Sequence, residues 1–134
     1  MMIYDAILAG CKTTKPLHGQ YMTWDRRACA LGAAMVGADI TEFYDLNVNQ
    51  ALLKHFPELG FSAICPVGNC RLVEGTMSGC SYVIHLNDDH EWSRERIAFH
   101  LRDKLENEEI NRTHRQFITE LLDDFSKVKE LINV

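Results

Sequence analysis

The sequence has no long hydrophobic run, no excess of positive charge and no low-complexity segment. No stretch reaches the roughly 18 apolar residues that a membrane-spanning helix needs. The first residues, MMIYDAILAGCKTTK, are too short and too acidic for a signal peptide, so we expect a cytoplasmic protein with no membrane partner. The net charge of −5 argues against a protein that binds duplex DNA, because such a protein needs a basic face. A nucleic acid is therefore not an expected partner, and the one basic cluster is interpreted as solvated surface: Lys12, Lys15, Arg26 and Arg27.

Familiar catalytic motifs are also missing. The chain contains no phosphate-binding glycine loop, no G-x-S-x-G and no H-E-x-x-H. One enzymatic alternative is a thiol chemistry at Cys29, near the start of a predicted helix, where the helix dipole and two neighbouring arginines would lower the thiol pKa. Candidate bases are His18, His85 and His90. The competing interpretation is a buried packing cysteine, since small apolar residues surround Cys29.

The composition is that of an ordinary globular protein. A chain of 134 residues with 46% hydrophobic residues fits a single domain, residues 1–134, with a core of normal size. In the first half, helical spacing of Ile3, Ala6, Ile7 and Cys11 predicts a short helix. A second helix is expected to be capped by Thr23 or Asp25 and to end at Gly37, and its small residues would allow close packing. A third would begin at the N-cap Asn47 and stop at Pro57.

The second half is expected to hold short strands and further helices. Two strands are predicted around residues 62–65 and 71–74. The stretch SYVIHLN is either a strand or a helix ended by Asn87 in the left-handed conformation. A helix capped by Ser93 should run to about residues 104–107.

The last predicted helix, residues 111–133, is amphipathic. Its seam has 3-4-3-4 spacing: Ile118, Leu121, Phe125, Val128 and Ile132. Phe117, Leu122 and Leu131 widen the seam. The width favours a helix packed on the protein's own core over a two-stranded coiled coil, and a homodimer through this helix is the alternative.

Cysteine and histidine cluster in the sequence between residues 60 and 92. The pattern is C-x4-C-x14-H-x4-H, formed by Cys65, Cys70, His85 and His90. Thiolates and imidazoles in such spacing suit zinc, and four protein ligands indicate a closed, structural site. Cys80 is an alternative ligand in place of His90. The competing interpretation is that Cys65, Cys70 and Cys80 are buried thiols, since five cysteines in a reducing compartment are not expected to form disulfides.

Two segments resemble motifs of a family of small bacterial and phage proteins without an established activity. These segments are CALGAA, residues 29–34, and HLNDDHEWSRERIA, residues 85–98. Some family members carry a Cys-Pro-x-x-Cys element before the second motif, where this chain has CPVGNC. The resemblance implies no activity, but it implies that Cys65, Cys70, His85 and His90 belong to one site.

Together these features predict a mainly α protein, at most α+β, with one helical domain. Its loop-rich insert, residues 60–92, would be held by zinc, and a long amphipathic helix would form the C-terminal part. The favoured function is a non-enzymatic binding or regulatory module. The alternatives are a thiol enzyme using Cys29 and a protein that self-associates through its last helix.

Overall fold

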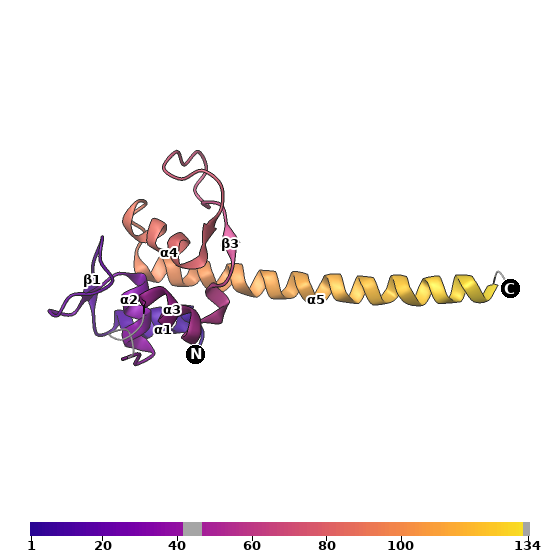
Figure 1. Ribbon diagram of the computed structural model, residues 1–134, viewed down its shortest axis with the longest axis horizontal. Coiled ribbons are helices and arrows are strands. Elements are labelled where there is room, and N and C mark those ends of the chain that lie inside the picture. The colour runs from indigo at the N-terminus through magenta and orange to yellow at the C-terminus, as the bar shows by residue number, and fades with distance from the viewer. Residues whose placement is uncertain (42–46, 133–134) are drawn as a thin grey trace. The chain divides into compact units, whose positions relative to one another are not determined.

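The computed structural model describes residues 1–41 and 47–132, except for the side chains of residues 129–132. The protein is mainly helical, as predicted, and consists of two compact units, Met1–Arg102 and Asp103–Val134. Its helices are α1 (Ile3–Cys11), α2 (Ala30–Gly37), α3 (Val48–His55), α4 (Gly79–Asp88) and α5 (Arg94–Ile132), with a short 3-10 helix at Pro57–Leu59 (Figure 1). Strands β1 (Lys15–Pro16) and β2 (Arg27–Ala28) pair in parallel, and β3 (Ser62–Ala63) and β4 (Met77–Ser78) pair antiparallel.

Helices α1 and α2 of the first unit pack so closely that the backbone of one helix contacts the backbone of the other. A Cβ added to Gly10 of α1 would collide with the carbonyl oxygen of Ala33, and one added to Gly37 of α2 would collide with that of Ala6. The small residues of α2 therefore allow the close approach that the sequence predicted. Large side chains from several helices complete the core around this contact: Ile3, Ile7, Leu31, Met35, Leu52, Leu86, Ile97 and Leu101.

The start of α2 differs from the prediction. The helix begins at Ala30 with Cys29 as its N-cap, and not at Thr23 or Asp25. Those two residues belong instead to the turn before β2, where the Thr23 hydroxyl is hydrogen-bonded to the Asp25 carboxylate and accepts the Arg27 N–H. The pairing of Arg27 and Ala28 with β1 holds the chain extended there and excludes a helix that runs through these residues.

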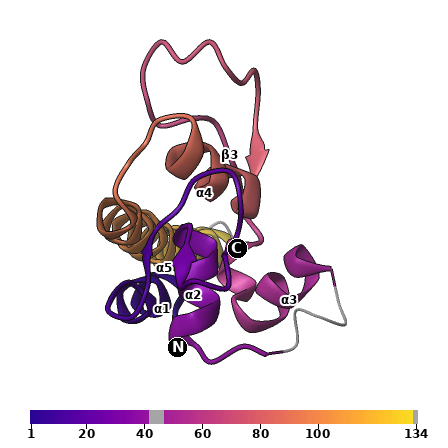
Figure 2. The ribbon, with the colours of Figure 1, turned by 90° about the vertical axis from the view of Figure 1, so that its left-hand side faces the viewer.

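Helix α3 agrees with its predicted boundaries, since Asn47 caps it by accepting the Asn49 N–H and it ends two residues before Pro57. The strand predicted at residues 71–74 is wrong, because β3 pairs with residues 77–78. The chain between the two strands forms a loop that projects beyond α4 (Figure 2). The stretch SYVIHLN is helical, but Asn87 lies inside α4, and the left-handed residue is Glu91, with φ of 52°.

Helix α5 is continuous, whereas the sequence predicted two helices separated near residues 107–111. Ser93 caps it, as expected, by accepting the Arg96 N–H. No glycine or proline interrupts the helix, and the Lys104 ammonium bonds the Glu108 carboxylate one turn further on, so the polar stretch stays helical. Within the described part of the chain, no helix has the length and apolar character to cross a membrane.

The second unit holds the rest of α5, and most large apolar side chains in its described part are exposed to solvent. Seven large apolar residues are 42% to 71% exposed. We call these residues the α5 stripe: Ile110, Phe117, Ile118, Leu121, Leu122, Phe125 and Val128. Two further residues of the predicted seam, Leu131 and Ile132, have side chains outside the described residues.

Candidate metal centre

Four donor atoms from three segments of the first unit converge on one point. Cys65 and Cys70 lie in the loop between β3 and β4, His85 lies in α4, and His90 follows that helix. The ligand atoms of all four residues lie within 4.8 Å of one another. The structure therefore brings together the four donors that the C-x4-C-x14-H-x4-H spacing singled out, and this cluster could hold a metal ion.

The individual separations can be compared with those of a tetrahedral ion. Nε2 of His85 lies 3.0 Å from Nε2 of His90 and 3.2 Å from Sγ of Cys65. Sγ of Cys65 lies 3.3 Å from Nε2 of His90, and Sγ of Cys70 lies 3.5 Å from Nε2 of His85. Ligands on a tetrahedral zinc would be about 3.3 Å apart for two nitrogens and about 3.5 Å apart for a nitrogen and a sulfur. These four of the six separations lie within about 0.3 Å of the values for a tetrahedral ion of that size.

Each of the two cysteines interacts with a backbone N–H two residues further along the chain. Sγ of Cys65 accepts the backbone N–H of Val67 at 3.4 Å, and the Cys70 thiol interacts with the backbone N–H of Leu72, again two residues on. Between them, Asn69 adopts a left-handed conformation with φ of 63°, which asparagine tolerates better than most residues. The loop thus turns both sulfurs toward the histidines and offers each of them an N–H donor.

These N–H donors act on the charge of the sulfurs. The pKa of Cys70 is lowered to about 6, chiefly by the Leu72 N–H and further by His90, His85 and Cys65. The pKa of Cys65 is raised, first by desolvation and then by the neighbouring Cys70 thiolate. At neutral pH the pair therefore carries one thiolate, which is the form that binds metals.

His85 is oriented by a carboxylate. Its ring is 3% exposed, and its Nδ1 lies 2.7 Å from Oδ2 of Asp89, one helical turn further along the chain. A carboxylate accepts a hydrogen bond from the Nδ1–H, so the lone pair of Nε2 points at the sulfurs. Metal-binding histidines commonly have such a partner, because it fixes the tautomer and raises the basicity of the ring. The sequence analysis missed this role of Asp89, although its i+4 spacing from His85 on a helix was a usable signal.

The residues between the two histidines attach the site to α2. The side chain of Asn87 is 1% exposed and uses both ends of its amide: Oδ1 accepts the N–H of Ala30 at 3.0 Å, and Nδ2 donates to the carbonyl of Leu17 at 3.0 Å. Oδ1 of Asp88 accepts the backbone N–H of Gly19 at 3.0 Å. No spacing rule in the sequence pointed to these contacts, because their partners are more than 50 residues away.

The second motif continues with a buried arginine at the start of α5. The guanidinium of Arg94 is 5% exposed and donates to the hydroxyl of Thr14 at 2.6 Å and to the carbonyls of Thr14 and Ala28 at 2.9 and 3.3 Å. The neighbouring Arg96 guanidinium lies 3.8 Å from the ring centroid of Trp92, in cation–π geometry. These contacts join the β1–β2 region to the chain that leaves the metal cluster.

Cys80, the alternative ligand, is not one of the four clustered donors. It lies in the first turn of α4, five residues before His85, and five residues rotate a helix by about 140° beyond a full turn. The two side chains therefore leave the helix on different faces. Cys80 is 5% exposed and its pKa is raised by burial, so it fits the buried-thiol interpretation.

Cys29 is also a buried thiol. It is 5% exposed and its Sγ accepts the N–H of Gly32 at 3.4 Å. The sequence predicted a lowered pKa, but burial raises it and outweighs the backbone N–H groups at the start of α2. Of the candidate bases, His85 and His90 belong to the metal cluster, and Nδ1 of His18 bonds the carbonyl of Asn87 at 2.7 Å. The environment of Cys29 is that of a packing residue.

Comparison of the sequence with protein-family models and with curated proteins, and comparison with solved structures, found no significant match. The chemistry of the site is therefore interpreted from its own residues.

Proposed function

We propose that the protein is a non-enzymatic binding module whose insert, residues 60–92, is held by a zinc ion on Cys65, Cys70, His85 and His90. The observation that carries the proposal is the convergence of these four donors at separations close to those of a tetrahedral coordination shell. Two thiolates and two imidazoles are a donor set that suits zinc in tetrahedral geometry, whereas magnesium and calcium take oxygen ligands.

A structural role follows from the number of ligands. A catalytic zinc keeps one position for water or substrate, and four protein ligands fill a tetrahedral ion completely. The ion would bind the loop between β3 and β4 to α4. Two large apolar side chains of this loop make little contact with the core, since Ile64 and Leu72 are each 67% exposed. Zinc would hold the loop to α4, which the few apolar contacts of the loop do not do. The helical core is large enough to fold without a metal.

Metal analysis of the purified chain tests the proposal. We expect one equivalent of zinc, and replacement by cobalt should give the visible absorption of a tetrahedral thiolate complex. Cys65→Ser should remove the high-affinity site, whereas Cys80→Ser and Cys11→Ser should keep the zinc content of the wild-type chain. Less than half an equivalent of metal after saturation with zinc and gel filtration would contradict the proposal.

The thiol-enzyme alternative receives no support from the site, because burial raises the pKa of Cys29 and the nearby histidines have other partners. Alkylation of Cys29 within minutes by iodoacetamide at neutral pH would reopen it. Protection of Cys29 in the folded chain is the expected result.

A further inference from the structure

The α5 stripe is too large to remain in contact with water. Seven half-exposed apolar side chains lie on 19 residues of one helix, from Ile110 to Val128. Isolated helices are marginally stable in water, and most helical stability comes from packing of the apolar face. A surface of this kind marks an interaction site.

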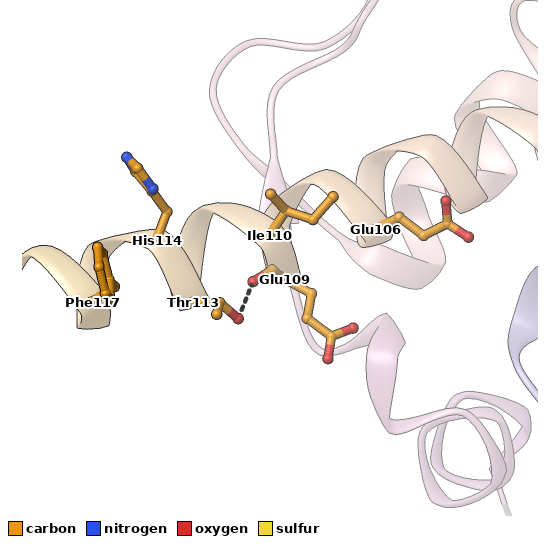
Figure 3. Close-up of a pocket in the computed structure, with 6 residues that line it drawn as sticks. All are labelled: Glu106, Glu109, Ile110, Thr113, His114 and Phe117. Atoms are coloured by element: carbon orange, nitrogen blue, oxygen red, sulfur yellow. Dashed lines mark hydrogen bonds between the residues drawn. The ribbon is translucent and has the colours of Figure 1, made fainter.

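The positions of the stripe match a heptad repeat. With Ile118 and Phe125 at a and Leu121 and Val128 at d, the other three members fall at e or g. Every outer position, b, c and f, from residue 106 to residue 128 holds a charged or polar residue. Figure 3 shows the beginning of the repeat, where an open depression of about 640 Å³ is lined on one side by Ile110, His114 and Phe117 and also by three residues at outer positions, Glu106, Glu109 and Thr113. The apolar surface is therefore confined to the face that a coiled coil buries.

We propose that the α5 stripe binds the same stripe of a second copy of this chain, in a parallel, in-register two-stranded coiled coil. In that arrangement each a or d residue packs against the same residue of the second copy. Asn111, at a, faces the Asn111 of the second copy, and His114, at d, faces the second His114, while Ile118, Leu121, Phe125 and Val128 form four successive apolar layers. A single asparagine at an a position is a known determinant of register and of the two-stranded state.

An antiparallel pair in the register that brings Ile118 beside Leu121 makes a poorer match. Its a positions meet d positions of the partner, so the register that pairs Ile118 with Leu121 also pairs Asn111 with Val128 and His114 with Phe125. Both polar groups would then be buried against apolar side chains without a hydrogen-bond partner, which costs about 1–3 kcal/mol for each group. The parallel arrangement matches polar layers with polar layers and apolar layers with apolar layers.

The parallel dimer also accounts for the width of the α5 stripe. Apolar residues at e and g normally suggest a helix packed in a larger core. In a parallel pair, however, position g of one helix lies beside position e of the next heptad of its partner. Phe117, at g, would thus cover Leu122, at e, on both sides of the seam. Seven half-exposed side chains contribute roughly 700 Å² per helix, close to the about 800 Å² per partner of a standard stable interface.

Sedimentation velocity of the full chain over a range of concentrations tests the proposal. We expect the wild-type chain to have the mass of a dimer, and the double variant Leu121→Glu with Phe125→Glu to dissociate at concentrations at least about 100-fold higher than the wild type does. The matched control, Thr119→Glu with Ser126→Glu at outer positions of the same two turns, should remain dimeric. A monomeric wild-type chain, or a double variant as dimeric as the control, would overturn the proposal. Far-UV circular dichroism confirms that each variant is helical.

A cysteine at position 128 tests the orientation. In the parallel dimer the two copies of Val128→Cys face each other, so mild oxidation should link them, and peptide mapping should find the cross-link at position 128. In the antiparallel register the same positions are roughly 25 Å apart along the axis, so no such link can form. A dimer without this cross-link would overturn the parallel arrangement. The wild-type chain, oxidised in the same way, is the control for its native cysteines.

Discussion

Oδ2 of Asp89 lies 2.7 Å from Nδ1 of His85, and this contact connects an exposed carboxylate to a buried imidazole of the metal cluster. The side chain of Asp89 is 49% exposed and that of His85 is 3% exposed. The carboxylate is thus accessible to solvent while it selects the tautomer of a ring that solvent does not reach. A change at Asp89 should therefore affect the metal more than the fold.

Replacement of Asp89 by asparagine should weaken zinc binding by about 10- to 100-fold, because the orienting partner of the ligand loses its charge. Competition with a chromophoric chelator measures the affinity. Glu74→Gln, in the loop that holds the two cysteines, is the control for loss of a nearby charge and should bind zinc like the wild-type chain. Equal affinities of the two variants would show that the His85–Asp89 contact plays no part in metal binding.

The cysteines should differ in their rates of alkylation. In the metal-free chain at pH 7, Cys70 should react first with iodoacetamide, because its pKa of about 6 leaves it mostly as thiolate above that pH. Cys11, with a pKa raised to about 11 mainly by burial, should react slowly until the pH approaches that value. Mass spectrometry of the labelled peptides gives each rate. Zinc should protect Cys65 and Cys70 and leave the rate of Cys11 unchanged; if Cys70 labelled no faster than Cys11, the assigned order would be wrong.

Asn87→Ala should lower the free energy of unfolding by about 2–4 kcal/mol. The substitution leaves the N–H of Ala30 and the carbonyl of Leu17 without their partner in a buried position, and each such group costs about 1–3 kcal/mol. Urea denaturation with zinc present measures the change. Gln50→Ala, at an exposed position of α3, should alter stability by less than about 0.5 kcal/mol, and a similar small effect at Asn87 would refute its anchoring role.

Gly10→Ala should destabilise the protein by about 1–3 kcal/mol or more, although alanine is the better helix former. The added methyl group collides with the backbone of α2 at Ala33, which cannot move away as a flexible side chain would. The control is Gly68→Ala in the cysteine loop, where no atom lies within 4 Å of the added group and stability should stay close to that of the wild-type chain. Thermal unfolding of both variants at equal zinc saturation measures the two stabilities, and equal stabilities would contradict the prediction.

The four clustered donors were accessible from the sequence because their spacing is local and their chemistry is narrow. The C-x4-C-x14-H-x4-H spacing is close to that of zinc sites built from two cysteines and two histidines. By contrast, the contacts of Asn87 and Arg94 join residues 57 to 80 positions apart. No local pattern predicts which backbone group such a side chain will meet.

At two places the secondary structure departs from the local preference of the sequence. Thr23 and Asp25 have the chemistry of helix caps, but pairing of β1 with β2 uses the adjacent backbone, so the helix begins later, at Ala30, with Cys29 as its N-cap. A strand was predicted at residues 71–74 because of local propensity, whereas the sulfur of Cys70 engages this stretch through the Leu72 N–H. The β1–β2 pairing thus prevails over the local preference for a helix, and β3 pairs with residues 77–78 instead of with residues 71–74.

The contacts of the stretch from His85 to His90 constrain the number of residues that it can contain. Its two histidines place their ring nitrogens beside the sulfurs of the cysteine loop. Asn87 and Asp88 accept hydrogen bonds from the backbone N–H groups of Ala30, in the first turn of α2, and of Gly19. One residue inserted into a helix turns everything after it by about 100°. An insertion or deletion here would therefore misalign one set of contacts whenever it preserved the other, so natural variants should keep the number of residues in this stretch constant.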